Sequence, residues 1–552
     1  MSNKSVNATI PAPYSWQPST YWDGNDGYWN SFIVRVGTPL QDFRILPSTA
    51  GQETWVLNPQ GCVDGEDPPS CPYVRGAIPP SVGLDVNTSS TWLSNGIFTL
   101  NAQEEQLGYT GNGLYGFHTV VLGTDDRAMN LSHQVLASIA DKSYFLGQFG
   151  LGPKPINFTT FNEPIPNYLT TLVNFSTIPS LSFGYTAGAA YRNKMPASLT
   201  LGGHDSNRFS PANLSITMNV DNSRPLQIGL QQVQATGTII GDVDLLPEGT
   251  FHFVDSTIPH TWLPQDAVNA FVSTFGSSYD SSTGLFLIND TVRERNLQAM
   301  PTLNFSFGAS LSGGPTQTIS LPYSAFDLQA GYPFYENATN YFPIRVAHND
   351  TQYTIGRKFF QEAYVIADWE RQNCTIAQTS FDNLNNEHLV AINSPTRETA
   401  ATTIAPNTNT KGLSKGVIAG IAIGALLLTG AAILAVVFCI RRRREQQARN
   451  IAEDEASRGT THGTPALHEH EVEPMLPYAK PEMSSDHAVN ELPASADPVE
   501  VDGKSQAIPS HYLELPAGSD AVLEHTVNPN ARERQARVHR LRWSPSSFGR
   551  RT

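Results

Sequence analysis

Charge and cysteine are both scarce in this chain. Of its 552 residues only 15% are charged, and 50 acidic residues outnumber 35 lysines and arginines, which leaves a net charge of −15. This balance excludes nucleic acid as the expected partner, because clustered basic side chains bind the phosphate backbone. The sequence also lacks a His-Glu-X-X-His motif, a phosphate-binding loop, a cofactor fingerprint and any spacing typical of metal ligands. We therefore expect neither a metal nor a cofactor.

Charge is absent altogether from one segment near the C-terminus. Residues 416–440 carry no charged side chain, and four arginines, 441–444, follow at once. As a helix the segment extends roughly 37 Å at about 1.5 Å per residue, enough to cross a hydrocarbon core about 30 Å thick. The arginines indicate the cytoplasmic end. The pattern predicts a single-pass type I membrane protein in contact with membrane lipid, with its larger part outside the cell or in the lumen.

Asn-X-Ser/Thr sequons occur only before this segment. Their one-sided distribution favours an extracellular or luminal glycoprotein. The N-terminal residues lack the apolar stretch of a secretory signal, so we expect that a signal peptide precedes the recorded start. The predicted glycosylation sites are Asn3, Asn7, Asn87, Asn130, Asn157, Asn174, Asn213, Asn289, Asn304, Asn337, Asn349 and Asn373.

The part before the membrane segment reads as β structure. Short runs alternate with the period of a half-buried strand at residues 31–36, 197–201 and 363–367. Turn residues separate such runs over more than half of the chain, which is typical of a large all-β domain. One helix is also predicted, because apolar residues recur with helical period between Pro264 and Gly276.

Two segments resemble the active-site strands of pepsin-like aspartic peptidases. This family carries an Asp-Thr/Ser-Gly triplet in each of two lobes, and the triplets here are Ser48-Thr49-Ala50 and Asp255-Ser256-Thr257. Further segments match the family in order along the chain. These are Val36-Gly37-Thr38-Pro39, residues 113–120 after the flap, residues 146–152, Leu201-Gly202-Gly203-His204-Asp205 and residues 354–368.

The resemblance implies a bilobal pepsin-like fold with additional segments. Residues from Ser394 to Lys415 are rich in Thr, Ala, Pro and Asn, and the tail is polar with few aromatics, so neither is expected to pack. The predicted units are an N-terminal segment 1–27, an N-terminal lobe 28–205, a C-terminal lobe 206–381, a Thr/Pro-rich stalk 382–415, a transmembrane helix 416–440 and a disordered cytoplasmic tail 441–552.

The resemblance also identifies the candidate site. The family's reaction needs two carboxylates that share one proton, and here Asp255 survives while Ser48 occupies the other position. Thr49 and Ser256 keep the hydroxyls that join the two lobes in the family, whereas both triplet glycines are replaced. Tyr109 is a candidate for the family's flap tyrosine. Glu53 and Asp42 are the nearby carboxylates that could replace the missing one.

Cysteine placement fits an oxidising compartment. Cys62 and Cys71 enclose a short loop after an active-site strand, where the family often carries a small disulfide, and we expect them to be bonded. Cys374 then has no extracellular partner, which leaves it reduced, buried or available to another chain. Cys439 lies at the inner edge of the membrane segment, as a lipid-facing residue or a palmitoylation site.

These observations favour a catalytically impaired pepsin-like domain at a cell surface of fungal type. Its cleft would bind or sense an extended peptide or a cell-wall polymer, and its tail would have an unknown cytoplasmic partner. The alternative is a membrane-tethered aspartic endopeptidase with a non-standard pair of catalytic groups. A purely structural wall protein is a third possibility.

Overall fold

The computed structural model describes residues 10–396, apart from residues 101, 102, 160, 161, 213, 383 and 385. The described residues belong to one unit, residues 1–413. The predicted membrane helix, the tail, Cys439 and the sequons Asn3, Asn7 and Asn213 lie outside the described residues. Within the part that is described, no helix is long and apolar enough to span a membrane.

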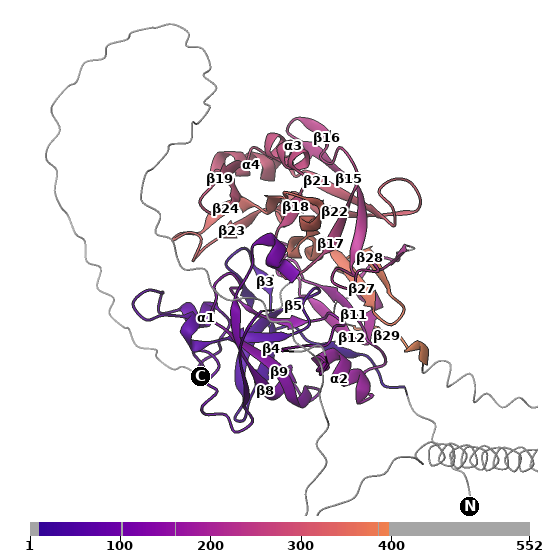
Figure 1. Cartoon of the computed structure of the whole chain (residues 1–552). Helices are drawn as coiled ribbons and strands as arrows, with labels where there is room; N and C mark the ends of the chain where they lie inside the picture. Colours follow the sequence, from indigo (N-terminus) through magenta and orange to yellow (C-terminus); the bar gives the residue numbers. More distant parts are fainter. Residues whose placement is uncertain are drawn as a thin grey trace, which may run out of the picture. The chain divides into compact units, whose positions relative to one another are not determined.

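The chain folds into two β-rich lobes, which confirms the predicted bilobal all-β class (Figure 1). The N-terminal lobe is built on a seven-stranded sheet in the order β4-β5-β10-β6-β9-β8-β7. Its strands are β4 (Phe32–Val36), β5 (Gln41–Ser48), β6 (Thr54–Leu57), β7 (Leu93–Thr99), β8 (Asn112–Leu122), β9 (Met129–Ile139) and β10 (Gly147–Gly150).

The C-terminal lobe combines an eight-stranded and a four-stranded sheet. The larger sheet contains β15 (Gln227–Thr238), β16 (Gly241–Asp244), β17 (Thr250–Val254), β18 (Thr261–Leu263), β21 (Thr302–Gly308), β22 (Thr316–Pro322), β25 (Ile344–Val346) and β26 (Thr354–Ile355). The smaller sheet contains β19 (Ser278–Asp280), β20 (Leu285–Leu287), β23 (Leu328–Ala330) and β24 (Thr339–Phe342).

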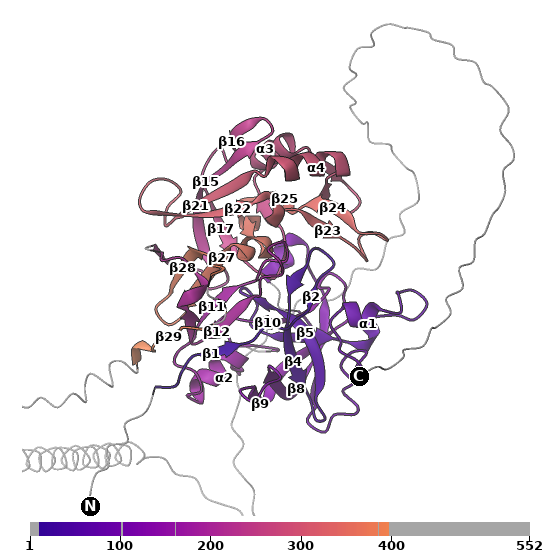
Figure 2. The same ribbon diagram turned by 180° about the vertical axis from the view of Figure 1, so that it is seen from behind.

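A six-stranded sheet joins the two halves of the chain. Strands β11 and β12 come from the end of the predicted N-terminal lobe, and β27 and β28 from the end of the predicted C-terminal lobe, yet the four lie side by side in both views (Figure 2). The order is β1-β12-β11-β27-β28-β14. The strands are β1 (Tyr14–Trp16), β11 (Ser182–Thr186), β12 (Ser198–Leu201), β14 (Ser215–Thr217), β27 (Ala363–Asp368) and β28 (Asn373–Gln378).

Two short strand pairs show that the folded unit extends beyond the predicted lobes. Strands β2 (Trp22–Asp23) and β3 (Trp29–Asn30) pair, and β13 (Gly203–Asp205) pairs with β29 (Leu389–Ala391). The first residues of the segment assigned to the stalk therefore pack on the domain. The strand is the apolar tripeptide Leu389-Val390-Ala391, which is too short to show a strand period in the sequence.

Helices are few among the described residues. They are α1 (Cys71–Val74), α2 (Tyr168–Asn174), α3 (Gln265–Phe275) and α4 (Asp290–Ala299), with short 3₁₀ turns between strands. The predicted helix after the second triplet is α3, which buries Val268, Phe271 and Phe275. It ends at Gly276, whose φ of 70° is a left-handed conformation that glycine adopts without strain.

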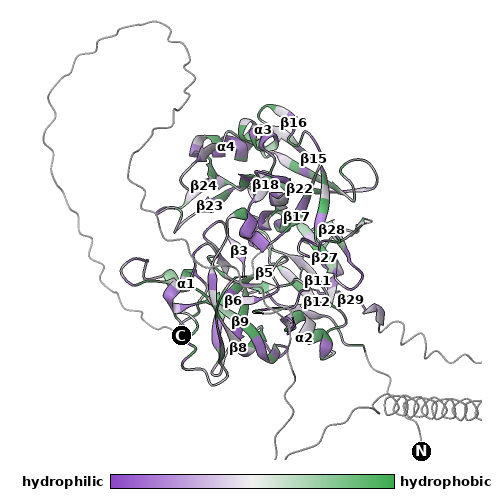
Figure 3. Cartoon of the chain, in the orientation of Figure 1, coloured by the Kyte–Doolittle hydropathy of each residue, from purple (hydrophilic) through white to green (hydrophobic). Residues whose placement is uncertain are grey.

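The hydrophobic core is built from side chains that are alternately buried along the strands. In β21, buried and half-buried residues alternate from Thr302 onward, and apolar and polar colours alternate along the strands in Figure 3. Such a pattern places one face of a sheet against the interior and leaves the other face toward solvent.

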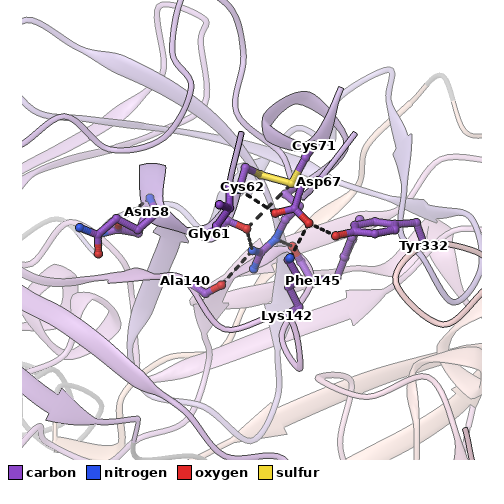
Figure 4. Close-up of a disulfide and its surroundings, with 12 residues drawn as sticks. Asn58, Gly61, Cys62, Asp67, Cys71, Ala140, Lys142, Phe145 and Tyr332 are labelled. Atoms are coloured by element: carbon purple, nitrogen blue, oxygen red, sulfur yellow. Dashed lines mark hydrogen bonds and ion pairs between the residues drawn. A yellow bond between two sulfur atoms is a disulfide. The ribbon is translucent and has the colours of Figure 1, made fainter. Parts of the chain in front are cut away.

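The predicted disulfide between Cys62 and Cys71 is present (Figure 4). Inside its loop, Asp67 accepts hydrogen bonds from Lys142 Nζ at 2.5 Å and from the hydroxyl of Tyr332. Because Tyr332 belongs to the C-terminal lobe, the loop joins the lobes beside the cleft. The thiol of Cys374 is buried, and burial raises its pKa to about 12, so it does not offer a surface group to another chain.

Candidate active site

The two triplets lie at equivalent ends of equivalent strands. Strand β5 ends at Ser48 and runs parallel to β10, which is antiparallel to β6. Strand β17 leads into Asp255 and runs parallel to β26, which is antiparallel to β18. Both side chains are almost fully buried, with Ser48 0% and Asp255 1% exposed. The repeated strand arrangement brings the two triplets together from opposite lobes.

Thr49 and Ser256 join the two loops by reciprocal hydrogen bonds. The Thr49 N–H donates to Ser256 Oγ and the Ser256 N–H donates to Thr49 Oγ1, each at 3.0 Å. The hydroxyls in turn donate to the carbonyls of Val254 and Pro47. Every polar group at this buried junction therefore has a partner, which fixes the relative position of the triplets.

Ser48 has no carboxylate that could contact Asp255, unlike the aspartate at this position in the family. Its hydroxyl shares a hydrogen bond with Thr257 Oγ1 at 2.6 Å and accepts one from the Gly51 N–H at 2.7 Å. Thr257 replaces a glycine of the family, and its N–H donates a hydrogen bond to Asp255 Oδ1 at 2.8 Å. The floor of the cleft thus holds one carboxyl and two hydroxyls.

A second carboxyl reaches Asp255 from the flap, the hairpin of β7 and β8 together with the segment between them. Its 3₁₀ turn η2 (Gln103–Leu107) carries Glu104, which is 2% exposed. The Glu104 carboxyl lies against Asp255 and Thr257. The hydroxyl of Tyr144 donates to Glu104 Oε2 at 3.4 Å, whereas Oε1 accepts from no N–H or hydroxyl group of the described residues. Two carboxyl groups can share a hydrogen bond only if one carries a proton.

Electrostatics assigns that proton to Glu104. Burial and the neighbouring charge of Asp255 raise the pKa of Glu104 well above its usual range. Burial also raises the pKa of Asp255, but hydrogen bonds from Glu104 and Thr257 and the charge of Arg357 act in the opposite direction. Both shifts favour a pair that retains one proton and carries one negative charge above the usual range of a carboxyl pKa.

Arg357 compensates the buried charge of Asp255. It opens the 3₁₀ turn η6 (Arg357–Gln361), and its guanidinium donates to the carbonyls of Ser256 and Thr257, the former at 2.8 Å. A further contact of 3.8 Å joins it to Asp26. An arginine held against the loop by backbone carbonyls supplies a fixed positive charge that supports a single ionised carboxylate.

A small cavity opens above the floor. Its volume is about 50 Å³, room for a few water molecules, and Ser48, Thr257, Tyr109 and His260 are among its lining residues. Tyr109 comes from the flap, and its ring centroid lies 5.9 Å from that of Tyr144 with the two rings tilted. His260 is 1% exposed, and among the described residues neither of its ring nitrogens has a hydrogen-bond partner.

Comparison with known proteins agrees with this geometry. The family model of eukaryotic aspartyl proteases matches residues 31–379, more than half of the chain. The chain belongs to the eukaryotic aspartyl protease family. An aspartic proteinase from Irpex lacteus is among the similar solved structures, with 17% identity, 68% of this chain and 99% of that chain covered, and a TM-score of 0.46. No curated protein matches.

In this aspartyl protease, the carboxylates expected to replace the missing aspartate lie elsewhere. Glu53 is 4% exposed and accepts hydrogen bonds from Trp55 Nε1 at 3.0 Å and from the Tyr115 hydroxyl at 2.5 Å. Asp42 pairs with Arg35 across β4 and β5. Neither of these two candidates has a hydrogen bond or ion pair with Asp255 among the described contacts.

Sequence reasoning missed Glu104, Arg357 and His260. Glu104 lies in an acidic stretch, Gln103-Glu104-Glu105-Gln106, inside a hairpin that otherwise lacks charge. Arg357 stands where the family segment around Gly356 has an acidic residue, and His260 follows the second triplet closely. The unusual residue types were visible, but their convergence depends on how the flap folds over the floor.

Most described sequons of the protease domain are solvent-accessible. The side chains of Asn289 and Asn349 also cap helical turns by accepting from backbone N–H groups. Exposed sequons are Asn87, Asn130, Asn174, Asn289, Asn337 and Asn349, and half-buried ones are Asn157, Asn304 and Asn373.

Proposed function

We propose that this aspartyl protease domain binds or senses an extended peptide or polymer and has lost most or all of its peptidase activity. The observation that carries the proposal is the composition of the cleft floor, where Asp255 faces the hydroxyls of Ser48 and Thr257. A hydroxyl can bind water, but it cannot serve as an acid near working pH. Losing one positioned acid or base costs roughly 10²–10⁴ in rate.

Glu104 does not restore the missing floor group in this arrangement. It extends from the flap, and a substrate that lies between flap and floor would separate it from Asp255. The family reaction needs its paired carboxyls on the same side of the substrate, with water between them. The two carboxyls are thus in contact only when the flap, and not a substrate, occupies the space above the floor.

The cleft nevertheless retains room for a ligand. Beside the cavity at Ser48, a second cavity of about 420 Å³ is lined by flap residues, by Trp262 and Arg345, and by Pro333 and Phe334. Both cavities share Tyr109 and Phe334. A groove with aromatic walls and a few polar groups is suited to an extended peptide or polymer.

The setting we propose is a membrane surface. The uncharged segment 416–440 followed by arginines supports a single type I span, and the one-sided sequons support a glycosylated ectodomain outside the cell or in the lumen. A cytoplasmic tail of more than a hundred residues would then be available to an intracellular partner.

A second candidate function is an acid endopeptidase that uses Glu104 with Asp255. The specific observation in its favour is that Glu104 lies against Asp255 with both carboxyls buried, which raises both pKa values and favours a pair with one proton, as the family reaction requires. It would require Glu104 to remain near Asp255 while substrate is bound.

One assay separates the two functions. The purified full-length protein, and its Asp255→Asn, Glu104→Gln and Ser48→Asp variants, are tested for cleavage of unfolded casein from about pH 3 to 6. Binding of fluorescent casein is measured in parallel and also at about pH 7.5. The proposed function predicts binding without cleavage by the unsubstituted protein.

The variants identify which groups act. Efficient cleavage that both Asp255→Asn and Glu104→Gln abolish would establish the second candidate and reject the first. Cleavage gained only in Ser48→Asp would show a competent scaffold that lacks one acid. We expect no gain, because Thr257 Oγ1 lies 2.6 Å from Ser48 Oγ and leaves little space for a larger carboxyl.

A further inference from the structure

We propose that the flap tip is a pH-dependent latch, in which protonated Glu104, bound to Asp255, holds the flap closed over the cleft in acid and releases it toward neutral pH. This concerns the regulation of the cleft, and it rests on the proposed function because ligand binding is the event that the latch would control. The argument depends on which contacts hold the flap tip and which of them respond to pH.

Apolar contacts hold the tip at one side. Leu107, 7% exposed, packs in a cluster with Ile258, Trp262 and Ala347 of the C-terminal lobe. These side chains carry no titratable group, so the contact contributes to closure at every pH.

Hydrogen bonds to uncharged groups hold the outer side. Gln352 Nε2 donates to the Gln106 carbonyl at 2.6 Å, and Arg224 donates to Gln106 Oε1 at 3.0 Å. The arginine remains charged throughout the accessible pH range. Neither contact provides a pH response.

Glu104 is the contact that changes with pH. It inserts its carboxyl between flap and floor, where it meets Asp255 and Thr257. An ionised Glu104 would place two negative charges together in a buried site, a costly arrangement. Loss of its proton therefore opposes closure, whereas the protonated group stabilises closure through the shared hydrogen bond.

Three titratable groups around Glu104 are neutral in the closed state. Burial raises the pKa of Tyr109 to about 12 and that of Tyr144 further, and burial lowers the pKa of His260 well below its usual range, so these three stay neutral. The titratable and charged groups facing the tip are Asp255, Tyr109, Tyr144, His260, Arg357, Arg345 and Asp26 on the cleft side, and Glu105, Arg224 and Asp350 on the outer side.

The direction of the response follows from proton linkage. The closed flap raises the pKa of Glu104, whereas an open flap exposes the carboxyl to water and returns it toward the ordinary value of 4.5. The closed state therefore binds the proton more tightly and is fully stabilised below that ordinary value. Its advantage is lost as the pH rises through the raised value, by about tenfold in the closed-to-open ratio per pH unit.

Hydrogen exchange of the flap tests this latch. Amide protection of residues 103–109 is measured by mass spectrometry on the full-length protein in detergent at about pH 4 and pH 7.5, after correction for the intrinsic pH dependence of exchange. We expect the protection factor of this segment to fall by about tenfold or more between the two conditions, whereas α3 changes little.

Two matched variants assign the response to one carboxyl. Glu104→Gln keeps a hydrogen-bond donor toward Asp255 but cannot ionise, so its flap should stay protected at both pH values. Glu105→Gln removes a carboxyl from the adjacent exposed position and should behave as the unsubstituted protein. Equal protection of the unsubstituted flap at both pH values, or a Glu104→Gln flap that still opens, would overturn the proposal.

Casein binding distinguishes this proposal from the function it regulates. If the flap opens with pH but fluorescent casein binds at neither value, the latch stands and the proposed function fails. If casein binds equally at both values while flap protection stays constant, the latch fails and the proposed function stands.

Discussion

At the scale of single residues, the cleft is shaped by groups that are buried and by the partners they have. Burial raises the pKa of Asp255, and Arg357 and the Thr257 N–H oppose that shift, whereas burial and Asp255 together raise the pKa of Glu104 well above its usual range. The same principle applies outside the cleft. A buried titratable group either has a compensating partner or takes its neutral form.

Substitutions at Thr49 test the hydrogen bonds that join the two triplets. Thr49→Val preserves shape but removes the hydroxyl that accepts from the Ser256 N–H, which leaves that buried donor unsatisfied. We expect a loss of about 1–3 kcal/mol in the free energy of unfolding, measured by urea denaturation. Thr49→Ser retains the hydroxyl and should lose clearly less. Equal losses in the two variants would show that the hydroxyl is not what stabilises the junction.

A substitution at Lys358 tests whether its buried amine is neutral in the folded protein. It is 0% exposed, its Nζ lies 4.1 Å from the ring centroid of Phe326, and among the described residues it has no hydrogen-bond partner. Burial lowers its pKa well below the ordinary 10.5, so folding releases a proton. Lys358→Met should therefore stabilise the domain at neutral pH.

The sign of the pH dependence makes this prediction specific. The unfolded chain binds a proton that the folded chain does not, so the unsubstituted protein gains stability as pH rises toward 10.5. The advantage of Lys358→Met should shrink by about 1.4 kcal/mol per pH unit in urea titrations across this range. Lys194→Met, at an exposed lysine, should show no such trend. A constant difference between Lys358→Met and the unsubstituted protein would contradict neutral burial.

At the scale of elements, short connections determine how the lobes meet. The flap turn η2 contacts the C-terminal lobe, and the disulfide loop reaches Tyr332 through Asp67. Both connections leave the N-terminal lobe and border the cleft. Changes in these loops should alter the cleft without changing the sheets.

Removal of the disulfide is the corresponding prediction. Replacing Cys62 and Cys71 together by alanine should lower the free energy of unfolding by about 2–3 kcal/mol, because the bond restricts the unfolded chain. Urea denaturation with and without reductant measures the effect. Reductant should lower the unsubstituted protein to the level of the double variant and leave that variant unchanged. A further drop in the reduced variant would indicate that reductant acts elsewhere.

At the scale of the whole molecule, an aspartyl protease domain is joined to segments with no recognisable packing pattern. Beyond β29 the chain still contacts the domain, because the Ile392 N–H donates to the Gly202 carbonyl and Arg371 donates to the Asn393 carbonyl. The separation of a compact domain from an uncharged span and a polar tail is what the proposed topology requires.

The topology can be measured on cells that express the protein. Glycosidase should sharply lower its apparent mass, because sequons such as Asn87 and Asn130 are exposed. Protease added to intact cells should remove the domain and spare an epitope placed in residues 445–552, whereas permeabilised cells should lose both. An unglycosylated domain, or a tail cleaved on intact cells, would contradict the orientation.

The sequence alone determined the two-lobed fold, helix α3 and the disulfide. The two-lobed fold and the disulfide followed from the family resemblance, carried by ordered segments and by two nearby cysteines in a familiar position, and α3 followed from apolar spacing ended by Gly276. The two triplets could also be located in the sequence, because each follows a strand whose end is fixed by strand pairing.

Only the tertiary structure decided what surrounds Asp255. Glu104 is far from Asp255 in sequence, and its position depends on the flap folding over the cleft and on Leu107 packing against the other lobe. Linear spacing contains no information about such a contact. Sequence therefore revealed that one carboxyl was missing from the floor, and folding alone determined that another reaches the same place from above.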